Sequence, residues 1–541
     1  MPSEAASKSL PLGPSPVAVI LFALLCWSPT AAAEGDLSVR SPAQLEASIE
    51  RLAGSTSFLP ATAPRELEAR SCGTADLLDL HLGWDELADD QRDRVRRAIG
   101  PEEADGAGEG SERGVVPCFF NLANSVESEH FSIQWGPNGN TTTATAEALL
   151  EALETTRTTF LDGGYAQPLG NPDFRVPFYL GNSGGGAPSI SFSGGYATTC
   201  AEYQHAYVVL SSISADNGGI DVSNHELFHA VQMGSPSPYD VDSYYWEASA
   251  VWSEEFAEPT FNLYAWFLYA YTDHTEWPLD LTSNGSSEGF LHKYAMFILP
   301  IYIEEWAPEG LGVLLDVWNA SGGSVIQRMN ASWEERGYST WFARQFGHFT
   351  SHVSTLDFED RGAYLGNAVS ARELLEPPEE LEEDIEPGTF GSHFYEVSTD
   401  AAEGSNTKLL VEFEGDEDWV IALNRSENGI TAFSKVVLSD EEGRAELEGI
   451  DLGTRYEEVW VIVTNAPGSS GDYRLSVELV EQTEPAGSDR PDYEPPPGPA
   501  GGGQGCSECA ENKGGAHPFS YGAGRGLIAI LPLLFLCRRL R

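Results

Sequence analysis

Residues 224–232 read Asn-His-Glu-Leu-Phe-His-Ala-Val-Gln, and the apolar residues around the two histidines indicate a helix that is buried on nearly all sides. Residues four apart on a helix are separated by roughly 40° of rotation, so His225 and His229 are expected one above the other on one face. Two imidazoles placed in this way can hold two corners of a zinc tetrahedron. Glu226 lies beside them, where it can take a proton from water without binding the metal. A chance match is the competing interpretation, and the residues that follow favour the metal site.

The chain after this helix offers a third ligand. A catalytic zinc site takes three protein ligands and keeps one position for water. Gly234 and the two prolines after it end the first helix and predict a turn. A second helix is expected from about residue 242, and within it residues 246–255 read Trp-Glu-Ala-Ser-Ala-Val-Trp-Ser-Glu-Glu. Glu247, one turn inside this helix, is the predicted third ligand of Zn²⁺.

The two helices resemble those of the gluzincin clan of zinc metallopeptidases, as in its aminopeptidase branch. The closest resemblance is to secreted proteins of myxobacteria and their relatives that are classed as metalloproteases. Their pattern is His-Glu-(Leu/Phe)-Phe-His-Ala-Val-Gln, a short polar loop, and Trp-Glu-Ala-(Ser/Thr)-Ala-x-Trp, which this chain has at 225–232 and 246–252. The metzincin pattern is excluded, because Gln232 and Ser235 stand where it needs Gly and His. The resemblance covers roughly residues 120–370 and implies an α+β zincin-like catalytic domain with a mixed sheet and active-site helices.

The resemblance also implies a role for each residue of the motif. His225, His229 and Glu247 would bind Zn²⁺, and Glu226 would act as the general base that takes a proton from water. No other cofactor is implied.

Two residues outside the motif would assist it. Thermolysin-like enzymes carry an acid four residues after the Glu ligand, but Val251 stands there, so Glu254 is expected to support the metal ligands instead. In gluzincins a Tyr or His from a downstream helix donates a hydrogen bond to the oxyanion. Tyr294 is predicted to do this, with His292 as the alternative and an ordinary core tyrosine as the competing interpretation.

Two weaker signals lie elsewhere in this part of the chain. In gluzincins the strand before the motif helix pairs with extended substrate, which here points to residues 207–211; a core strand without a substrate role is an equally supported interpretation. His348 and His352 repeat the four-residue spacing, but no acid accompanies them, which favours an ordinary helix face over a second metal site.

The composition limits the partners. The chain of 541 residues has 83 acidic and 30 basic residues, a net charge of −53. Such a surface repels nucleic acid and anionic membrane, so neither is an expected partner. Calcium binding is the alternative to simple solubility in a salty medium, but the sequence has no Asp-x-Asp-x-Asp-Gly loop. The expected partners are a protein or peptide substrate and a sorting peptidase that processes the C-terminal tail.

Both ends of the chain indicate export. Lys8, an apolar stretch and three alanines predict a signal peptide cleaved after Ala33. Near the C-terminus Cys506 and Cys509, an apolar segment and terminal arginines resemble the MYXO-CTERM sorting tails of myxobacterial surface proteins; a plain membrane anchor is the alternative. The protein is therefore expected to be secreted through the inner membrane and anchored at the cell surface or outer membrane, or released from it.

Export also permits disulfides. Cys72, Cys118 and Cys200 lie in the region expected to fold, which allows three pairings or three free thiols. A Cys72–Cys118 bridge is predicted, because these two residues flank one polar loop.

Changes in composition divide the chain into parts. Residues 34–117 carry helical patterns and are either a pro-region removed on maturation or a permanent subdomain. Short alternating stretches after residue 388 predict an all-β sandwich, similar to the accessory domains of secreted proteases. The expected order is a signal peptide (1–33), the helical N-terminal segment (34–117), the zinc metallopeptidase catalytic domain (118–375), an acidic linker (376–388), the β-sandwich (389–482), a Pro/Gly-rich spacer (483–505) and the sorting or anchor segment (506–541).

The sequence therefore predicts a secreted or surface-anchored zinc peptidase that hydrolyses peptide bonds with water activated by the metal and by Glu226. Two alternatives remain open. One is a catalytically inactive surface adhesion or binding protein whose core is stapled by a metal. The other is a zinc hydrolase of non-peptide substrates.

Overall fold

The computed structural model describes residues 41–53, 71–83, 86–99, 120–200, 205–213, 217–260, 262–338, 341–383, 386–398, 407–415, 418–427, 429–440, 442–451, 458–467 and 472–481. These residues form a mixed α/β structure with many helices and several β-sheets, and its C-terminal part is rich in β-strand. The predicted signal peptide, spacer and sorting segment lie outside the described residues. Within the described part of the chain, we find no helix whose length and hydropathy would let it cross a membrane.

The N-terminal segment is helical, as its sequence pattern predicts. It contains α1 (Pro42–Leu52), the two-residue strand β1 (Ser71–Cys72), α3 (Thr74–Leu82) and α4 (Asp89–Ile99). Ser41 and Gln44 cap α1 reciprocally: the Ser41 hydroxyl accepts a hydrogen bond from the Gln44 N–H, and the Ser41 N–H donates to the Gln44 side chain. α3 ends just before Gly83, the expected break.

A six-stranded mixed sheet follows, in the spatial order β1-β5-β6-β4-β3-β2. β3, β4 and β6 are parallel neighbours, whereas β5 runs antiparallel to β6. The sequence predicts β3, β4 and β6 but not β5, whose sequence Gly-Gly-Tyr-Ala-Thr-Thr-Cys has few of the large apolar side chains that mark a strand. The strands of this sheet after β1 are β2 (Asn124–Glu127), β3 (Phe131–Trp135), β4 (Val176–Leu180), β5 (Gly194–Cys200) and β6 (His205–Leu210).

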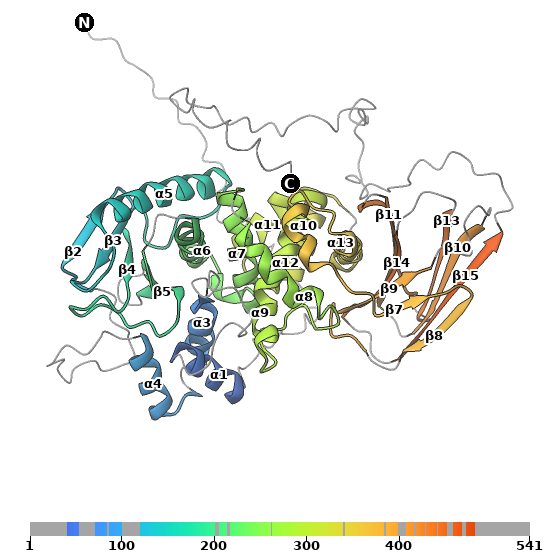
Figure 1. The fold of residues 1–541 in the computed structure, drawn as a ribbon, viewed down its shortest axis with the longest axis horizontal. Helices are drawn as coiled ribbons and strands as arrows, with labels where there is room; N and C mark the ends of the chain where they lie inside the picture. The colour runs from blue at the N-terminus through green and yellow to red at the C-terminus, as the bar shows by residue number, and fades with distance from the viewer. Residues whose placement is uncertain are drawn as a thin grey trace, which may run out of the picture. The chain divides into compact units, whose positions relative to one another are not determined.

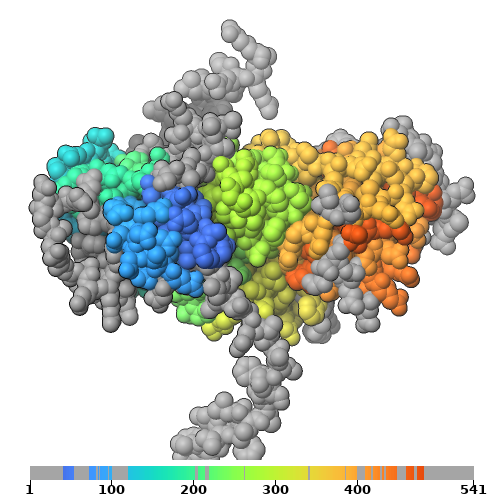
Figure 2. Space-filling model, turned by 90° about the horizontal axis from the view of Figure 1, so that it is seen from below, coloured from blue at the N-terminus to red at the C-terminus, as the bar shows by residue number. Residues whose placement is uncertain are grey.

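Helices cover both faces of this sheet (Figure 1). Side chains alternate along a strand, so Ala206 and Val208 of β6 share a core with α5 (Thr143–Asp162) and α6 (Asn217–Met233). Tyr207 and Val209 face the other way and pack with apolar residues of α1, α3 and α4. The N-terminal segment therefore forms a continuous apolar core with one face of the sheet, and Figure 2 shows its helices as one blue patch at the surface.

The chain after α6 is mainly helical. α6 packs on α7, which in turn packs on α9 and α10. The sequence predicts one apolar helix over residues 292–306, but the structure breaks it at Met296 and Phe297 into α9 and α10. The residues on both sides of the break are apolar, so the hydrophobic pattern carries no signal of it. The helices are α7 (Ser243–Ala257), α8 (Tyr269–Thr272), α9 (Ser287–Ala295), α10 (Ile298–Trp306), α11 (Gly310–Asn319), α12 (Val325–Glu335), α13 (Phe342–Thr355) and α14 (Arg361–Tyr364).

The C-terminal part consists of two sheets around a shared apolar core, in the orders β13-β10-β15-β8 and β12-β11-β14-β9-β7. Leu409, Trp419, Val461 and Tyr473 are among the buried residues between them. The strands are β7 (Glu373–Leu375), β8 (Glu379–Glu383), β9 (Ser392–Val397), β10 (Thr407–Glu414), β11 (Trp419–Glu427), β12 (Ile430–Leu438), β13 (Arg444–Asp451), β14 (Glu458–Asn465) and β15 (Tyr473–Glu481).

The acidic linker predicted over residues 376–388 is wrong for part of its length. Residues 379–383 form β8 and pair antiparallel with β15. Leu381 packs against the core of the two sheets, while Arg474 of β15 forms ion pairs with Glu380 and Glu382. The sequence suggests a solvated acidic segment, but Arg474 on the neighbouring strand β15 pairs with two of its acids.

Candidate metal centre

α6 and α7 form the frame of the site. α6 ends at Met233, just before Gly234 where its end is predicted, and α7 begins at Ser243, close to its predicted start, with the short helix η3 (Pro238–Asp240) in the turn between them. The two helices pack against each other beside the sheet (Figure 1). Every residue of α7 from Ser243 to Glu254 is buried. Glu247 therefore faces α6 from a rigid position.

Among the described residues, four buried side chains bring metal-binding atoms together: Cys72, His225, His229 and Glu247, whose donor atoms all lie within 4.8 Å of one another. His225 Nε2 lies 3.2 Å from Glu247 Oε2 and 3.2 Å from His229 Nε2. His229 Nε2 lies 3.6 Å from Glu247 Oε2 and 3.4 Å from Cys72 Sγ. The structure thus brings the three predicted ligands together and adds Cys72, which the sequence analysis did not assign to the site.

These separations fit a tetrahedral centre. Zinc binds nitrogen and oxygen at about 2.0–2.2 Å and sulfur at about 2.3 Å, so neighbouring donors around a tetrahedron lie about 3.3–3.6 Å apart. The four separations given above span 3.2–3.6 Å, and the other two, from Cys72 Sγ to the His225 and Glu247 donor atoms, are bounded at 4.8 Å. Two imidazoles, a carboxylate and a thiol are also donors that suit zinc chemically. The cluster can therefore hold a metal ion of this kind.

A side chain behind each histidine fixes its orientation. His229 Nδ1 lies 2.6 Å from Gln232 Oε1, and His225 Nδ1 lies 3.1 Å from Glu254 Oε1. Both oxygens accept hydrogen bonds, so each Nδ1 carries the proton and each Nε2 directs its lone pair into the cluster. Gln232 is held in turn, because its amide donates to the Trp246 carbonyl at 3.0 Å. Glu254 lies where its predicted supporting role requires it.

The charges of the cluster are coupled. Burial alone would raise the pKa of Glu247, but the contacts of its carboxylate with the His225 and His229 imidazoles hold it well below its ordinary value. Burial alone would lower the pKa of His229, but Glu247 raises it. Burial and the carboxylates of Glu226 and Glu247 raise the pKa of the Cys72 thiol well above its usual value. The surroundings therefore favour a positive charge at the centre, as a proton or a metal ion.

Glu226, the predicted general base, lies beside the cluster. The Thr74 hydroxyl donates to Glu226 Oε2 at 3.1 Å. Gly195 of β5 leaves room for the carboxylate, because a Cβ at this position would lie 3.0 Å from Glu226 Cγ. Burial raises the pKa of Glu226 to about 7, against the opposing charge of His229. A carboxyl group with such a pKa can take up and release a proton near neutral pH.

Tyr294 of α9 places its hydroxyl beside the ligands. The hydroxyl donates to the main-chain carbonyl of Cys72 at 2.9 Å, and the ring stacks on His225 with centroids 6.4 Å apart. The alternative residue, His292, instead contacts the rings of Tyr271 and Trp277, and burial lowers its pKa to about 3. Tyr294 rather than His292 reaches a carbonyl oxygen next to the cluster.

The predicted Cys72–Cys118 disulfide is wrong. Cys72 is a buried free thiol whose Sγ accepts a hydrogen bond from the Thr74 N–H at 3.3 Å. Cys200, in contrast, is disulfide-bonded. β1 directs Cys72 toward α6 and away from any pairing. The sequence signal for its position, a lone cysteine directly before a helix, is too common to be specific.

The predicted substrate edge is also wrong. Residues 207–210 belong to β6, which has β5 on one side and β4 on the other and so presents no free edge. β5 lies farther out, and β1 pairs with its outer side. The strand edge next to the cluster is therefore that of β5.

The second histidine pair does not form a metal site. His348 Nδ1 contacts the Ser434 hydroxyl at 3.3 Å, and His352 Nδ1 contacts the Asp357 carbonyl at 3.3 Å. Asp357 Oδ2 lies 3.4 Å from His352 Nδ1, but within the described part of the chain these side chains do not gather into a group that could hold a metal. The pair serves the packing of α13, the ordinary interpretation of its spacing.

No family model and no curated protein matches this chain. Among solved structures, the chain is similar to the pre-peptidase C-terminal domain of collagenase from Bacillus anthracis. The match has 11% sequence identity and covers 21% of this chain and 100% of that chain, with a TM-score of 0.15. At this TM-score the likeness carries no argument.

Proposed function

We propose that the protein is a zinc-dependent peptidase and that its sheet and helices α6 and α7 form a zincin-like catalytic domain. The observation that carries this proposal is the convergence of His225 Nε2, His229 Nε2 and Glu247 Oε2 on one point, at separations suited to a tetrahedral ion. Glu226 and Tyr294, the two other groups that peptide hydrolysis needs, lie next to that point.

The residues divide the chemistry between them. A zinc ion held there supplies Lewis acidity, which makes water acidic near pH 7 and polarises a peptide carbonyl. Glu226 accepts the proton of the attacking water and delivers it to the leaving amine. Tyr294 donates to the oxygen on which negative charge develops, as it now donates to the Cys72 carbonyl. Glu254 and Gln232 keep the two imidazoles in the tautomer that presents Nε2.

The sequence signals at both ends of the chain support a peptidase that is exported and held at the cell surface. Its substrate would be a protein or peptide outside the inner membrane, consistent with the strongly acidic composition that disfavours nucleic acid.

One observation favours a second candidate function. Structural zinc sites have four protein ligands, whereas catalytic sites keep one position open, and Cys72 brings the donor set here to four. The second candidate is therefore a surface binding protein whose fold is stabilised by a structural metal ion and which has no catalytic activity.

Cleavage of casein tests the two candidates. The full chain and its Cys72→Ala variant are assayed with and without a zinc chelator. The peptidase proposal predicts chelator-sensitive cleavage, and a further Glu226→Gln substitution should lower it by roughly 10²–10⁴-fold, the usual contribution of a general base, with zinc content unchanged. Glu147→Gln, at an exposed position on α5, is the matched control and should cleave normally. Absence of cleavage by both parent chains, or undiminished cleavage after Glu226→Gln, would refute the proposal.

A further inference from the structure

We infer that residues 71–82, which comprise β1 and α3 and are called the blocking segment below, inhibit this centre from within the chain. Cys72 is the fourth ligand of the metal, and the backbone around it occupies the strand edge on which a substrate would pair. The inference rests on the proposed function and adds its regulation: the centre is latent until the blocking segment moves away.

The blocking segment fills the edge of β5. Ser71 and Cys72 pair in parallel with Gly194 and Gly195. The Gly73 N–H donates to the Gly195 carbonyl at 2.9 Å. An extended peptide that adds to a sheet edge uses main-chain groups of this kind. With β1 in place, the outer side of β5 next to the cluster is already paired.

The Thr74 hydroxyl also binds the main chain of β5. It accepts a hydrogen bond from the Ala197 N–H of β5 at 2.8 Å. It also donates to Glu226 Oε2 at 3.1 Å and so binds the carboxylate that would have to receive a proton from water. One side chain thereby engages both the edge strand and the predicted general base.

Cys72 places two atoms at the centre. Its Sγ lies 3.4 Å from His229 Nε2 and takes the fourth corner, the position that a catalytic site keeps for water. Its carbonyl oxygen accepts the hydrogen bond of Tyr294, the group that a substrate carbonyl would need. The Ala75 N–H, at the start of α3, donates to Glu247 Oε1 at 3.1 Å. The blocking segment therefore contacts four residues that the proposed reaction uses: His229, Glu226, Glu247 and Tyr294.

The thiol at the fourth corner also explains why the segment can remain intact at the centre. A peptide that presents its carbonyl carbon to an activated water is cut, whereas here the sulfur stands where that water would have to be. The Cys72 carbonyl lies on Tyr294, but the sulfur displaces the water that would attack it.

A second contact outside the centre holds the blocking segment in place. Arg51 of α1 forms an ion pair with Asp76 of α3, with Nη2 2.5 Å from Oδ1, and the Asp76 side chain is only 1% exposed. The Arg51 guanidinium also lies 4.6 Å from the centre of the Phe290 ring on α9. These contacts tie α1, α3 and α9 together.

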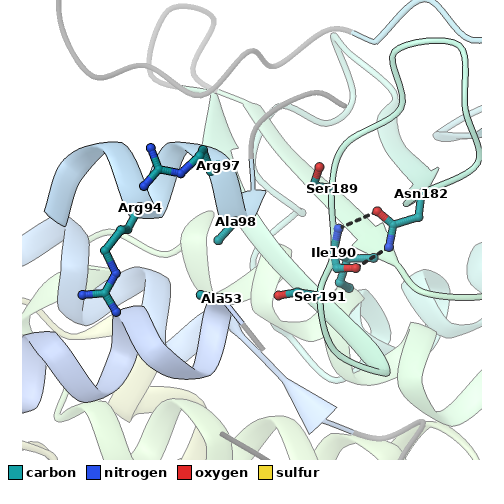
Figure 3. Close-up of a pocket in the computed structure, with 8 residues that line it drawn as sticks. All are labelled: Ala53, Arg94, Arg97, Ala98, Asn182, Ser189, Ile190 and Ser191. Atoms are coloured by element: carbon teal, nitrogen blue, oxygen red, sulfur yellow. Dashed lines mark hydrogen bonds between the residues drawn. The ribbon is translucent and has the colours of Figure 1, made fainter. Parts of the chain in front are cut away.

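Away from the metal centre, the contact between the N-terminal segment and the rest of the chain contains a pocket. A pocket with a volume of about 370 Å³ separates α4 from the chain around residues 182–191, as Figure 3 shows. Arg94, Arg97 and Ala98 line one side of it, and Asn182, Ser189 and Ile190 line the other. Beside this pocket the Ser191 hydroxyl donates to the Leu52 carbonyl, so the N-terminal segment makes polar contacts here as well as at the metal ligands.

The test replaces zinc by cobalt in the full chain, because a thiolate bound to Co²⁺ gives a near-ultraviolet charge-transfer band that imidazole and carboxylate ligands do not give. We expect the wild-type chain to show this band and the Cys72→Ala variant to lose it while still binding one Co²⁺ per chain. A Cys506→Ala/Cys509→Ala/Cys537→Ala triple variant controls for the cysteines of the tail and should keep the band. Bound cobalt without the band in the wild type overturns the inference, whether or not the variant folds.

The second readout is the cleavage of casein by the zinc-loaded chains. Because activity scales with the fraction of molecules in the open state, Cys72→Ala should raise it by about tenfold or more. Equal cleavage by wild type and Cys72→Ala overturns the inference and leaves the peptidase standing. The cobalt band together with no cleavage by either chain refutes both, and makes Cys72 a ligand of a structural centre.

Discussion

Two regions of the molecule supply ligands to one centre, and they are built differently. The α6–α7 pair provides His225, His229 and Glu247 from consecutive helices whose contact is buried throughout. The blocking segment reaches the same point from 157 residues before His229, through a strand of two residues. The first region lies wholly within the core, whereas the second is held by a few hydrogen bonds, one metal ligand and the buried leucines of α3, Leu77, Leu78 and Leu80. The difference separates the permanent half of the centre from the half that we propose is removable.

The largest effect is expected in the permanent half. Glu247 is fully buried and contacts both imidazoles, so Glu247→Ala removes a ligand that no neighbour can replace. Zinc affinity should fall by more than about 100-fold, since substitutions of residues behind the ligands already cost 10–100-fold. A competitive titration with a colorimetric chelator measures it, with Glu147→Ala as control. Full zinc occupancy in Glu247→Ala would mean that another residue is the ligand.

An intermediate effect is expected at Tyr294, where the two halves meet. Assayed in the Cys72→Ala background, Tyr294→Phe should lower kcat by roughly 10²–10³-fold with little change in KM, as loss of an oxyanion donor does. In the otherwise wild-type chain the same substitution removes the hydrogen bond to the Cys72 carbonyl, so alkylation of Cys72 by iodoacetamide should become faster. A change confined to KM would contradict the role in the reaction.

The smallest effect is expected at the anchor of the blocking segment. Arg51→Ala removes the partner of a buried carboxylate and should destabilise the closed position by about 1–2 kcal/mol, a factor of roughly 5–30 in the open population. Alkylation of Cys72, followed by mass spectrometry of the digested peptide that contains it, reports this opening. Arg92→Ala is the matched control, because its ion pair with the fully exposed Asp89 contributes little. Equal alkylation rates in the two variants would show that Arg51 does not hold the segment.

The same comparison explains what the sequence could predict. The helices α6 and α7 and the convergence of His225, His229 and Glu247 follow from periodicity and spacing within one continuous stretch, where local rules decide the geometry. Cys72 joins them through a pairing with β5 that no local rule encodes: β1 is too short to show alternation, and the glycines of β5 look like a loop. The substrate edge was misplaced for the same reason. Without β5, β6 would be an edge strand; with β5 paired to it, β6 is an interior strand.

The β-rich C-terminal part, which holds none of the site residues, shows the same difference between strands that the sequence predicts and strands that it misses. Strands such as β11 and β14, with alternating or continuous apolar residues, follow from the sequence. β8 does not, since four of its five residues are glutamates. Arg474, which lies 92 residues after Glu382, supplies a countercharge to this strand, and Leu381 packs in the core between the two sheets. Long-range partners, rather than local composition, decided each element that the sequence analysis missed.

The most direct test of the account is the zinc X-ray absorption spectrum of the full wild-type chain loaded with one equivalent of metal. The account predicts four ligands, one sulfur at about 2.3 Å and three nitrogen or oxygen atoms at about 2.0–2.2 Å. A shell of six oxygens, or a chain that binds no zinc, would contradict the claim that α6, α7 and β1 hold a single ion between them.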